Sequence, residues 1–147
     1  MLKIRVIPVL LWNGREAVQS THFKRPHRPV GSFMQHIENY EQRNIDELVT
    51  LDVEASREGR EPLFEDIKEF TSKIFAPVAI GGGIRTLEHI AKMLKAGADK
   101  VIINSALYKD EEFIYQAVRK FGAQAITASI NNIYDHGVNI ICNSDGT

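Results

Sequence analysis

Two spacings of apolar residues alternate along this chain. Near-continuous apolar runs, typical of strands buried on both faces, occur at 3–11, 46–53, 77–80, 100–103 and 123–130. Between them, apolar side chains recur every three or four positions, the spacing of one helix face, and predict helices at 32–43, 63–74, 87–94 and 113–121. Two extended segments around a turn within 134–142 predict a terminal hairpin.

This strand–helix alternation predicts an α/β fold with a parallel sheet and crossover helices. Two architectures satisfy it: an open doubly wound sheet, or part of an eight-unit barrel, which normally needs about 250 residues. No GxGxxG motif follows the first strand, which disfavours a dinucleotide-binding fold.

One long segment, 12–31, fits neither spacing. It concentrates the basic and histidine residues His22, Lys24, Arg25, His27 and Arg28, interrupted by two prolines, and we interpret it as a polar loop. Such a loop either places cations over an anionic ligand or is simply solvated surface.

The three glycines at 81–83 stand where the third strand turns into a helix. Backbone N–H groups at a helix start, unobstructed by side chains, bind phosphate, so Gly82 and Gly83 are candidate phosphate-binding residues. The alternative is a tight turn that needs glycine for positive φ. Asn104 and Ser105, at the end of the next strand, favour the phosphate site.

In either architecture, ligands bind at the carboxyl ends of the strands. These ends carry Leu11, Asp52, the glycines, Asn104 with Ser105, and Asn131. Asp52 is the one carboxylate among them, so the paired titratable groups of general acid–base catalysis are missing. Asp52 either contacts a ligand or caps neighbouring loop amides.

At the opposite ends of the strands lie Arg5, Glu47 and Lys100. Buried charges are costly unless paired, so these side chains should meet across the strand bases. They form either a stabilising ion-pair cluster or a functional ring that controls entry from below.

Composition narrows the function classes. The 147 residues carry 18 Lys+Arg against 19 Asp+Glu, a net charge of −1, so no overall basic field indicates nucleic acid. The single cysteine, Cys142, excludes an intrachain disulfide and a cysteine-only metal cage. The apolar N-terminal run is too short to span a bilayer. We expect a cytoplasmic protein without a metal, cofactor or membrane association.

The motifs together resemble one family. They are RVI at 5–7, DELVTLDVEAS at 46–56, GGGI at 81–84, GADKV at 97–101, INSA at 103–106 and FGAQA at 121–125. The chain resembles the N-terminal portion of the HisF-like cyclase subunit of imidazole glycerol phosphate synthase, a (β/α)8 barrel of histidine biosynthesis, whose activity is that of a lyase and cyclase.

The resemblance implies a glutaminase (HisH-like) partner that docks on the N-terminal face and releases ammonia into the barrel. Arg5, Glu47 and Lys100 would then be ammonia-gate residues, and Asp99 would lie at the partner interface. Gly82, Gly83, Asn104 and Ser105 would hold one phosphate of a phosphorylated ligand, and Asp52 would match a further acidic position.

Departures from the family pattern affect catalysis. Its two catalytic carboxylates follow strands one and five, where this chain has Leu11 and Asn131, and a lysine of the first loop is replaced by Gln19. Neither Leu11 nor Asn131 titrates, so enzyme activity is left open. This pattern resembles the diverged homologue of surface-polysaccharide clusters, where ammonia amidates a sugar. The alternative is an authentic cyclase.

The resemblance ends in the loop after strand five. We therefore predict a single domain over 1–147, a partial barrel of about four βα units plus strand five and the hairpin. Five strands cannot close an eight-stranded barrel, and an open edge favours self-association. An inactive half-barrel is the remaining alternative.

Overall fold

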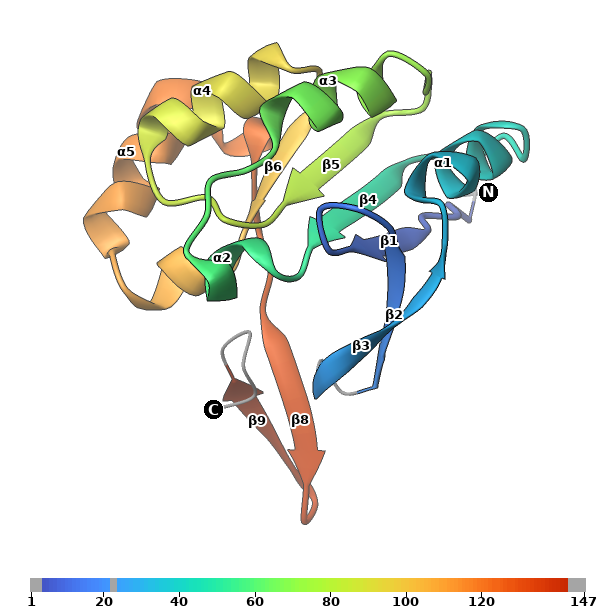
Figure 1. The fold of residues 1–147 in the computed structure, drawn as a ribbon. Helices are drawn as coiled ribbons and strands as arrows, with labels where there is room; N and C mark the ends of the chain where they lie inside the picture. The colour runs from blue at the N-terminus through green and yellow to red at the C-terminus, as the bar shows by residue number, and fades with distance from the viewer. Residues whose placement is uncertain (1–3, 22–23, 143–147) are drawn as a thin grey trace.

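The computed structural model describes residues 4–21 and 24–142, and within them seven strands form one open sheet (Figure 1). Its centre is parallel and follows chain order: β1 (Val9–Trp12), β4 (Leu48–Asp52), β5 (Val78–Gly81), β6 (Lys100–Ile103) and β7 (Ile126–Ala128). The parallel α/β arrangement predicted from the apolar runs is confirmed. Among the described residues β7 pairs only with β6, so this edge of the sheet is open.

Helices α1 (Phe33–Glu41), α3 (Phe64–Thr71), α4 (Leu87–Lys95) and α5 (Glu111–Phe121) confirm the four predicted helices, with ends shifted by a few residues. Three of them begin at a side chain that accepts a backbone hydrogen bond: Ser32, Thr86 and Asp110. Each satisfies an N–H group that the first helical turn leaves without a partner.

The core lies between these helices and one face of the sheet. Alternate strand residues such as Leu10, Trp12 and Val101 point into it, because successive side chains of a strand face opposite sides. Trp12 stacks on Phe33 at 4.7 Å between ring centroids, and both rings meet Phe70 edge-on. The aromatic cluster thus fixes α1 and α3 against β1.

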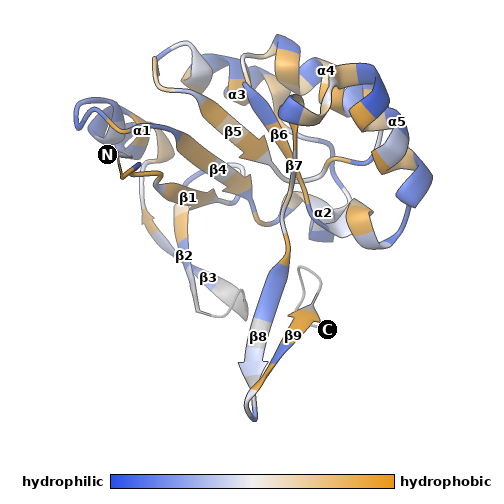
Figure 2. Cartoon of the chain, turned by 180° about the vertical axis from the view of Figure 1, so that it is seen from behind, coloured by the Kyte–Doolittle hydropathy of each residue, from blue (hydrophilic) through white to orange (hydrophobic). Residues whose placement is uncertain are grey.

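The second face of the sheet is much less covered. Viewed from behind, the apolar strands β1, β4 and β5 lie in front, with no described helix over them (Figure 2). Val9 on this face is 56% exposed, and Leu11, Val49 and Leu51 are half-buried. The sheet therefore has one packed face and one open face.

The prediction of a polar loop over 12–31 was wrong. Most of this segment forms β2 (Ala17–Thr21) and β3 (Lys24–Gly31), an antiparallel pair joined to β1. Pro26 and Pro29 are accommodated because β3 is the outermost strand of the sheet, where a missing N–H removes no necessary ladder bond. Gln19 accordingly lies on a strand.

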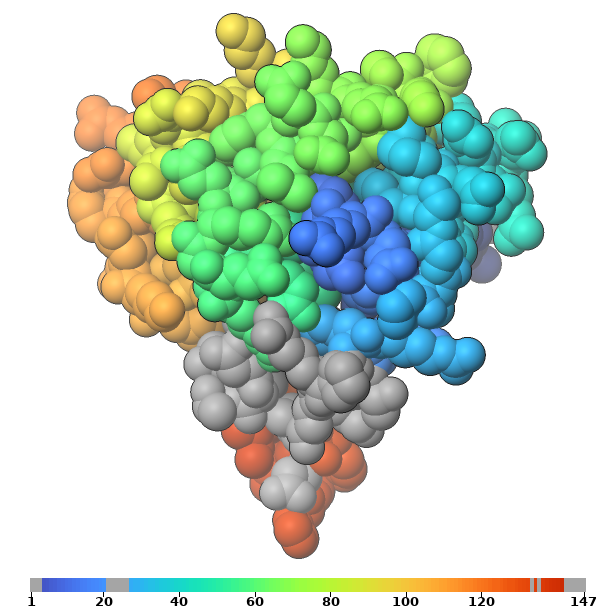
Figure 3. Space-filling model, in the orientation of Figure 1, coloured from blue at the N-terminus to red at the C-terminus, as the bar shows by residue number. Residues whose placement is uncertain are grey.

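The predicted terminal hairpin is confirmed as β8 (Asn131–Asp135) and β9 (Val138–Cys142), a two-stranded sheet of its own. His136 and Gly137 between the strands both have positive φ, which matches the twist of tight hairpins. The hairpin tip projects from the body of the molecule (Figure 3).

The spacing of apolar residues did not predict three short helical elements: α2 (Ala55–Glu58), η1 (Ser105–Tyr108) and η2 (Ala123–Ala125). The last shortens the strand expected at 123–130 to Ile126–Ala128. All three are single turns, too short to show an apolar period.

Candidate functional site

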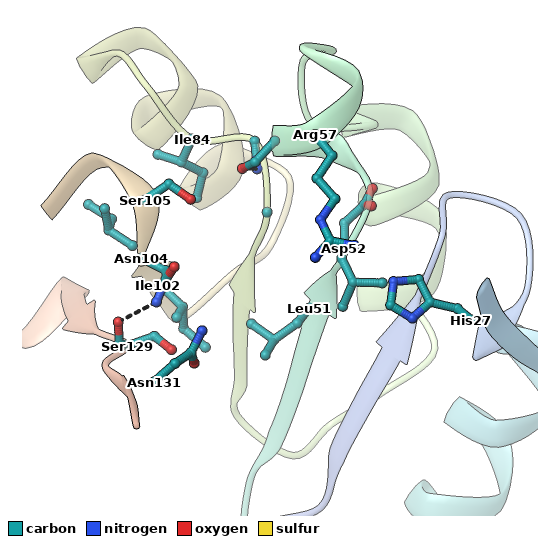
Figure 4. Close-up of a pocket in the computed structure, with 15 residues that line it drawn as sticks. His27, Leu51, Asp52, Arg57, Ile84, Ile102, Asn104, Ser105, Ser129 and Asn131 are labelled. Atoms are coloured by element: carbon teal, nitrogen blue, oxygen red, sulfur yellow. Dashed lines mark hydrogen bonds between the residues drawn. The ribbon is translucent and has the colours of Figure 1, made fainter. Parts of the chain in front are cut away.

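A pocket opens at the carboxyl ends of the parallel strands, where the sequence predicted a ligand site. Its walls come from the segments that follow β4, β5, β6 and β7, together with His27 from β3 (Figure 4). All of the predicted ligand-binding residues, Asp52, Gly82, Gly83, Asn104 and Ser105, line it. The structure thus brings together residues that lie up to 53 positions apart in the sequence.

Gly82 and Gly83 belong to the glycine loop (residues 81–83) and have φ of +119° and +71°. A Cβ on Gly82 would lie 2.5 Å from the backbone oxygen of Asp52, so only glycine allows this approach. The Gly83 N–H donates to Ser56 Oγ at 3.3 Å. The loop therefore needs glycine for close packing as well as for positive φ, as the tight-turn interpretation of the sequence expects.

Asn104 and Ser105 form the opposite wall with Ser129 and Asn131 (Figure 4). Asn104 Nδ2 donates to the Ser129 carbonyl at 2.7 Å, which anchors the side chain. Among the described residues, Asn104 Oδ1 is buried without a hydrogen-bond partner. Ser105 is the first residue of the short η1 turn.

Asp52 is held by its surroundings. Its Oδ1 accepts hydrogen bonds from the Glu54 and Ala55 amides, each at 3.1 Å, and Arg60 Nη2 lies 2.7 Å from both carboxylate oxygens. Burial raises the pKa of Asp52, and Arg60 opposes this shift. Of the two sequence interpretations, amide capping is the one that the geometry matches.

Leu11 and Asn131, the positions where the family resemblance implies catalytic carboxylates, differ in location. Asn131 begins β8 and lines the pocket, whereas Leu11 lies within β1, paired with Leu51, and is not among the described pocket residues. Neither side chain can transfer a proton. Among the described residues that line the pocket, Asp52 is therefore the one carboxylate.

Sequence reasoning missed two side chains of this region, Arg57 and Arg60, and it named His27 only as one of the basic residues of 12–31 that could lie over an anionic ligand. Arg57 reaches down from α2 toward Asp52, and His27 approaches from β3 (Figure 4). The cluster of cations at 22–28 was the available signal for His27. Arg60 gave none, because its pairing depends on how the loop after α2 folds back.

At the opposite end of the sheet, the three predicted charges meet. Arg5 Nη2 lies 2.7 Å from Glu47 Oε2, and Lys100 Nζ lies 2.8 Å from Glu47 Oε1. Glu47 is buried, and the hydrogen bond from Lys100 lowers its pKa against the opposing effect of burial, with a further contribution from Arg5. We call Arg5, Glu47 and Lys100 the Glu47 cluster.

Asp99 lies beside the Glu47 cluster at the base of β6. Its Oδ2 accepts a hydrogen bond from the Val78 amide at 2.8 Å, and its own amide donates to the Val78 carbonyl at 2.9 Å. The residue is exposed, so it connects β5 and β6 at the molecular surface.

The described residues lack the features of a metal site or a membrane span. No group of three or more His, Cys, Asp or Glu side chains is placed to hold a metal ion in this part of the chain. No helix in it combines the length and apolar character needed to cross a membrane.

The parallel sheet with a pocket at the carboxyl ends of its strands is the arrangement of α/β proteins, in which this edge is the usual place for a ligand. The family model described as "Histidine biosynthesis protein" matches residues 5–145. The chain therefore belongs to this family, whose fold is of the TIM-barrel type.

Individual relatives refine this assignment. Two similar proteins are named "Putative imidazole glycerol phosphate synthase subunit hisF2". The protein of Vibrio vulnificus (strain YJ016) is 43% identical over 90% of this chain and 48% of its own length. The protein of Campylobacter jejuni is 44% identical over 89% of this chain and 52% of its own length. The imidazole glycerol phosphate synthase subunit HisF of Dictyoglomus thermophilum is 40% identical over 89% and 52%. The chain spans about half the length of these relatives.

Proposed function

We propose that this chain is a HisF-like subunit that binds a phosphorylated ligand in the pocket and accepts ammonia from a glutaminase partner. The Glu47 cluster would be the gate on the partner's face, with Asp99 at the interface. The observation that carries this proposal is that the Glu47 cluster and the pocket are both assembled, while Leu11 and Asn131 stand where the resemblance implies carboxylates.

We further propose that the ammonia amidates a sugar of a surface polysaccharide. Loss of both carboxylates removes the acid–base pair for cyclisation but leaves phosphate binding and ammonia passage intact. The similarity to proteins named hisF2, beside those named HisF, supports a diverged paralogue.

The alternative function is the cyclase and lyase reaction of histidine biosynthesis, which the 40% identity to the Dictyoglomus HisF favours. Turnover of the histidine-pathway nucleotide with ammonia, at a rate near that of a true cyclase, would establish it. We expect a rate at least about a hundredfold lower, because neither Leu11 nor Asn131 can exchange a proton.

The open sheet supports one further structural proposal. Its five parallel strands would be five of the eight strands of a closed barrel, and the uncovered face would be the barrel interior. An inactive half-barrel predicts neither ligand binding nor a response of a glutaminase.

Ligand binding is tested by calorimetric titration with D-ribose 5-phosphate, a simple phosphorylated sugar. We expect saturable binding that is weakened at least about tenfold by Ser105→Ala combined with Asn104→Ala, since each supplies a polar contact worth about 1 kcal/mol. Ser72→Ala is the control, because Ser72 is exposed at the C-terminal end of α3 and is not among the described residues of the pocket. Binding of the phosphosugar that is equally strong in the double variant would place the ligand elsewhere.

A further inference from the structure

His27 and Glu54 form a buried acid–base pair at the wall of the pocket. His27 Nε2 lies 3.2 Å from Glu54 Oε1, and the two side chains are only 4% and 11% exposed. His27 lines the ligand pocket, while Glu54 lies behind it and lines a neighbouring polar cavity that His27 also borders. The imidazole therefore stands between the ligand space and a charged second cavity.

Among the described residues that line the pocket, one titratable side chain, His27, is suited to exchange a proton with a ligand. Arg57 stays protonated at any physiological pH, and Asp52 is committed to Arg60 and two backbone amides. Histidine is the side chain whose protonation changes around neutral pH. His27 is thus the pocket group equipped to exchange a proton with a ligand.

We infer that His27, held by Glu54, is the proton-exchanging residue of this site, in place of the two missing carboxylates. The inference rests on the proposed function of the pocket. If the neutral imidazole keeps its proton on Nε2, the nitrogen that lies 3.2 Å from Glu54 Oε1, it carries its lone pair on Nδ1. A proton leaving a ligand N–H or O–H passes to Nδ1, its bonding electrons stay on the ligand atom, and Glu54 balances the imidazolium charge.

Charged groups from every neighbouring element shape this equilibrium. They are Asp52 from β4 and Arg57 from α2 on the pocket side, and Glu54, Glu58, Arg15 and Arg60 around the second cavity. Glu54 lies within ion-pair distance of the ring, so we assign it as the positioning residue.

The test is an NMR titration of the histidine side chains in the full 147-residue chain, with and without inorganic phosphate. Wild type, Glu54→Gln and His89→Gln are compared. His89 is the matched control, since it is also a buried histidine beside a glutamate, at 3.5 Å from Glu61, but lies on α4 outside the described pocket. His27 is assigned in the wild type by through-bond correlation, so no His27 variant has to fold.

We expect the His27 titration midpoint to move to lower pH in Glu54→Gln and to higher pH when phosphate is bound. His89→Gln should change neither the His27 titration midpoint nor its shift with phosphate. An identical His27 midpoint in wild type and Glu54→Gln overturns the inference, whatever the effect of phosphate. The inference is also overturned if phosphate shifts the amide resonances of Gly82 and Gly83 but leaves the His27 midpoint unchanged. Phosphate that moves neither contradicts the proposed phosphate site instead, while the Glu54→Gln comparison still decides the inference.

Discussion

Glu47 is the residue that ties the base of the sheet together, because it accepts from both Arg5 and Lys100. Its pKa lies below the ordinary 4.5, so the ionised form stabilises the folded state above that pH, and this stabilisation is lost as pH falls through the lower folded value. Glu47→Gln should therefore flatten the loss of stability on acidification and cost about 1–2 kcal/mol at neutral pH.

The measurement is urea unfolding at several pH values between about 3 and 7. Glu65→Gln, which removes an exposed carboxylate of α3, is the control and should leave the pH profile unchanged. If Glu47→Gln and wild type lost stability in parallel below pH 4.5, the Glu47 cluster would have no role in acid stability.

Asp52 allows its capping and charge contributions to be separated. Asp52→Asn keeps an oxygen for the Glu54 and Ala55 amides, whereas Asp52→Ala removes it and also leaves Arg60 without this partner. Because burial raises the pKa of Asp52, its charge adds little net stability, and we expect Asp52→Ala to be about 1–2 kcal/mol less stable than Asp52→Asn. Equal unfolding midpoints for the two variants would contradict capping as its main role.

At the scale of elements, the β5–α4 turn depends on close backbone approach. Gly82→Ala combines strain at φ +119° with a contact of 2.5 Å to the Asp52 carbonyl. Gly31→Ala is a close control, since Gly31 has φ +114° with nothing within 4 Å of a Cβ. Both variants are measured by denaturant unfolding, and we expect Gly82→Ala to lose at least about 2 kcal/mol more unfolding free energy than Gly31→Ala, because overpacking adds to the φ strain. Similar losses would mean that φ strain alone explains the glycine.

Periodicity was enough to predict the parallel strands, the four longer helices and the β8–β9 hairpin. It failed for β2 and β3, because prolines and cations are tolerated on an edge strand that the sequence does not identify as an edge. The pocket residues after β4, β5 and β6 were predictable, since parallel strands bring their carboxyl ends together. The Asp52–Arg60 and His27–Glu54 pairs were not, because they depend on packing between separate elements.

At the scale of the whole molecule, the open β7 edge and uncovered sheet face predict association. We expect sedimentation equilibrium of the purified chain to show concentration-dependent oligomers. Thr127→Lys places a charge on β7 and should reduce association, while Lys95→Glu on exposed α4 surface should not. A monomer across the full concentration range would contradict this prediction.

The central claim is that this chain works with a glutaminase, and the most direct test is glutamine hydrolysis by a cognate HisH-like glutaminase with and without the chain. Saturating D-ribose 5-phosphate is present in both arms, and glutamate release is measured. We predict at least about tenfold stimulation by the wild-type chain, consistent with about 1.4 kcal/mol or more of coupling between the two proteins. No stimulation by a chain shown to be folded would contradict the proposed function.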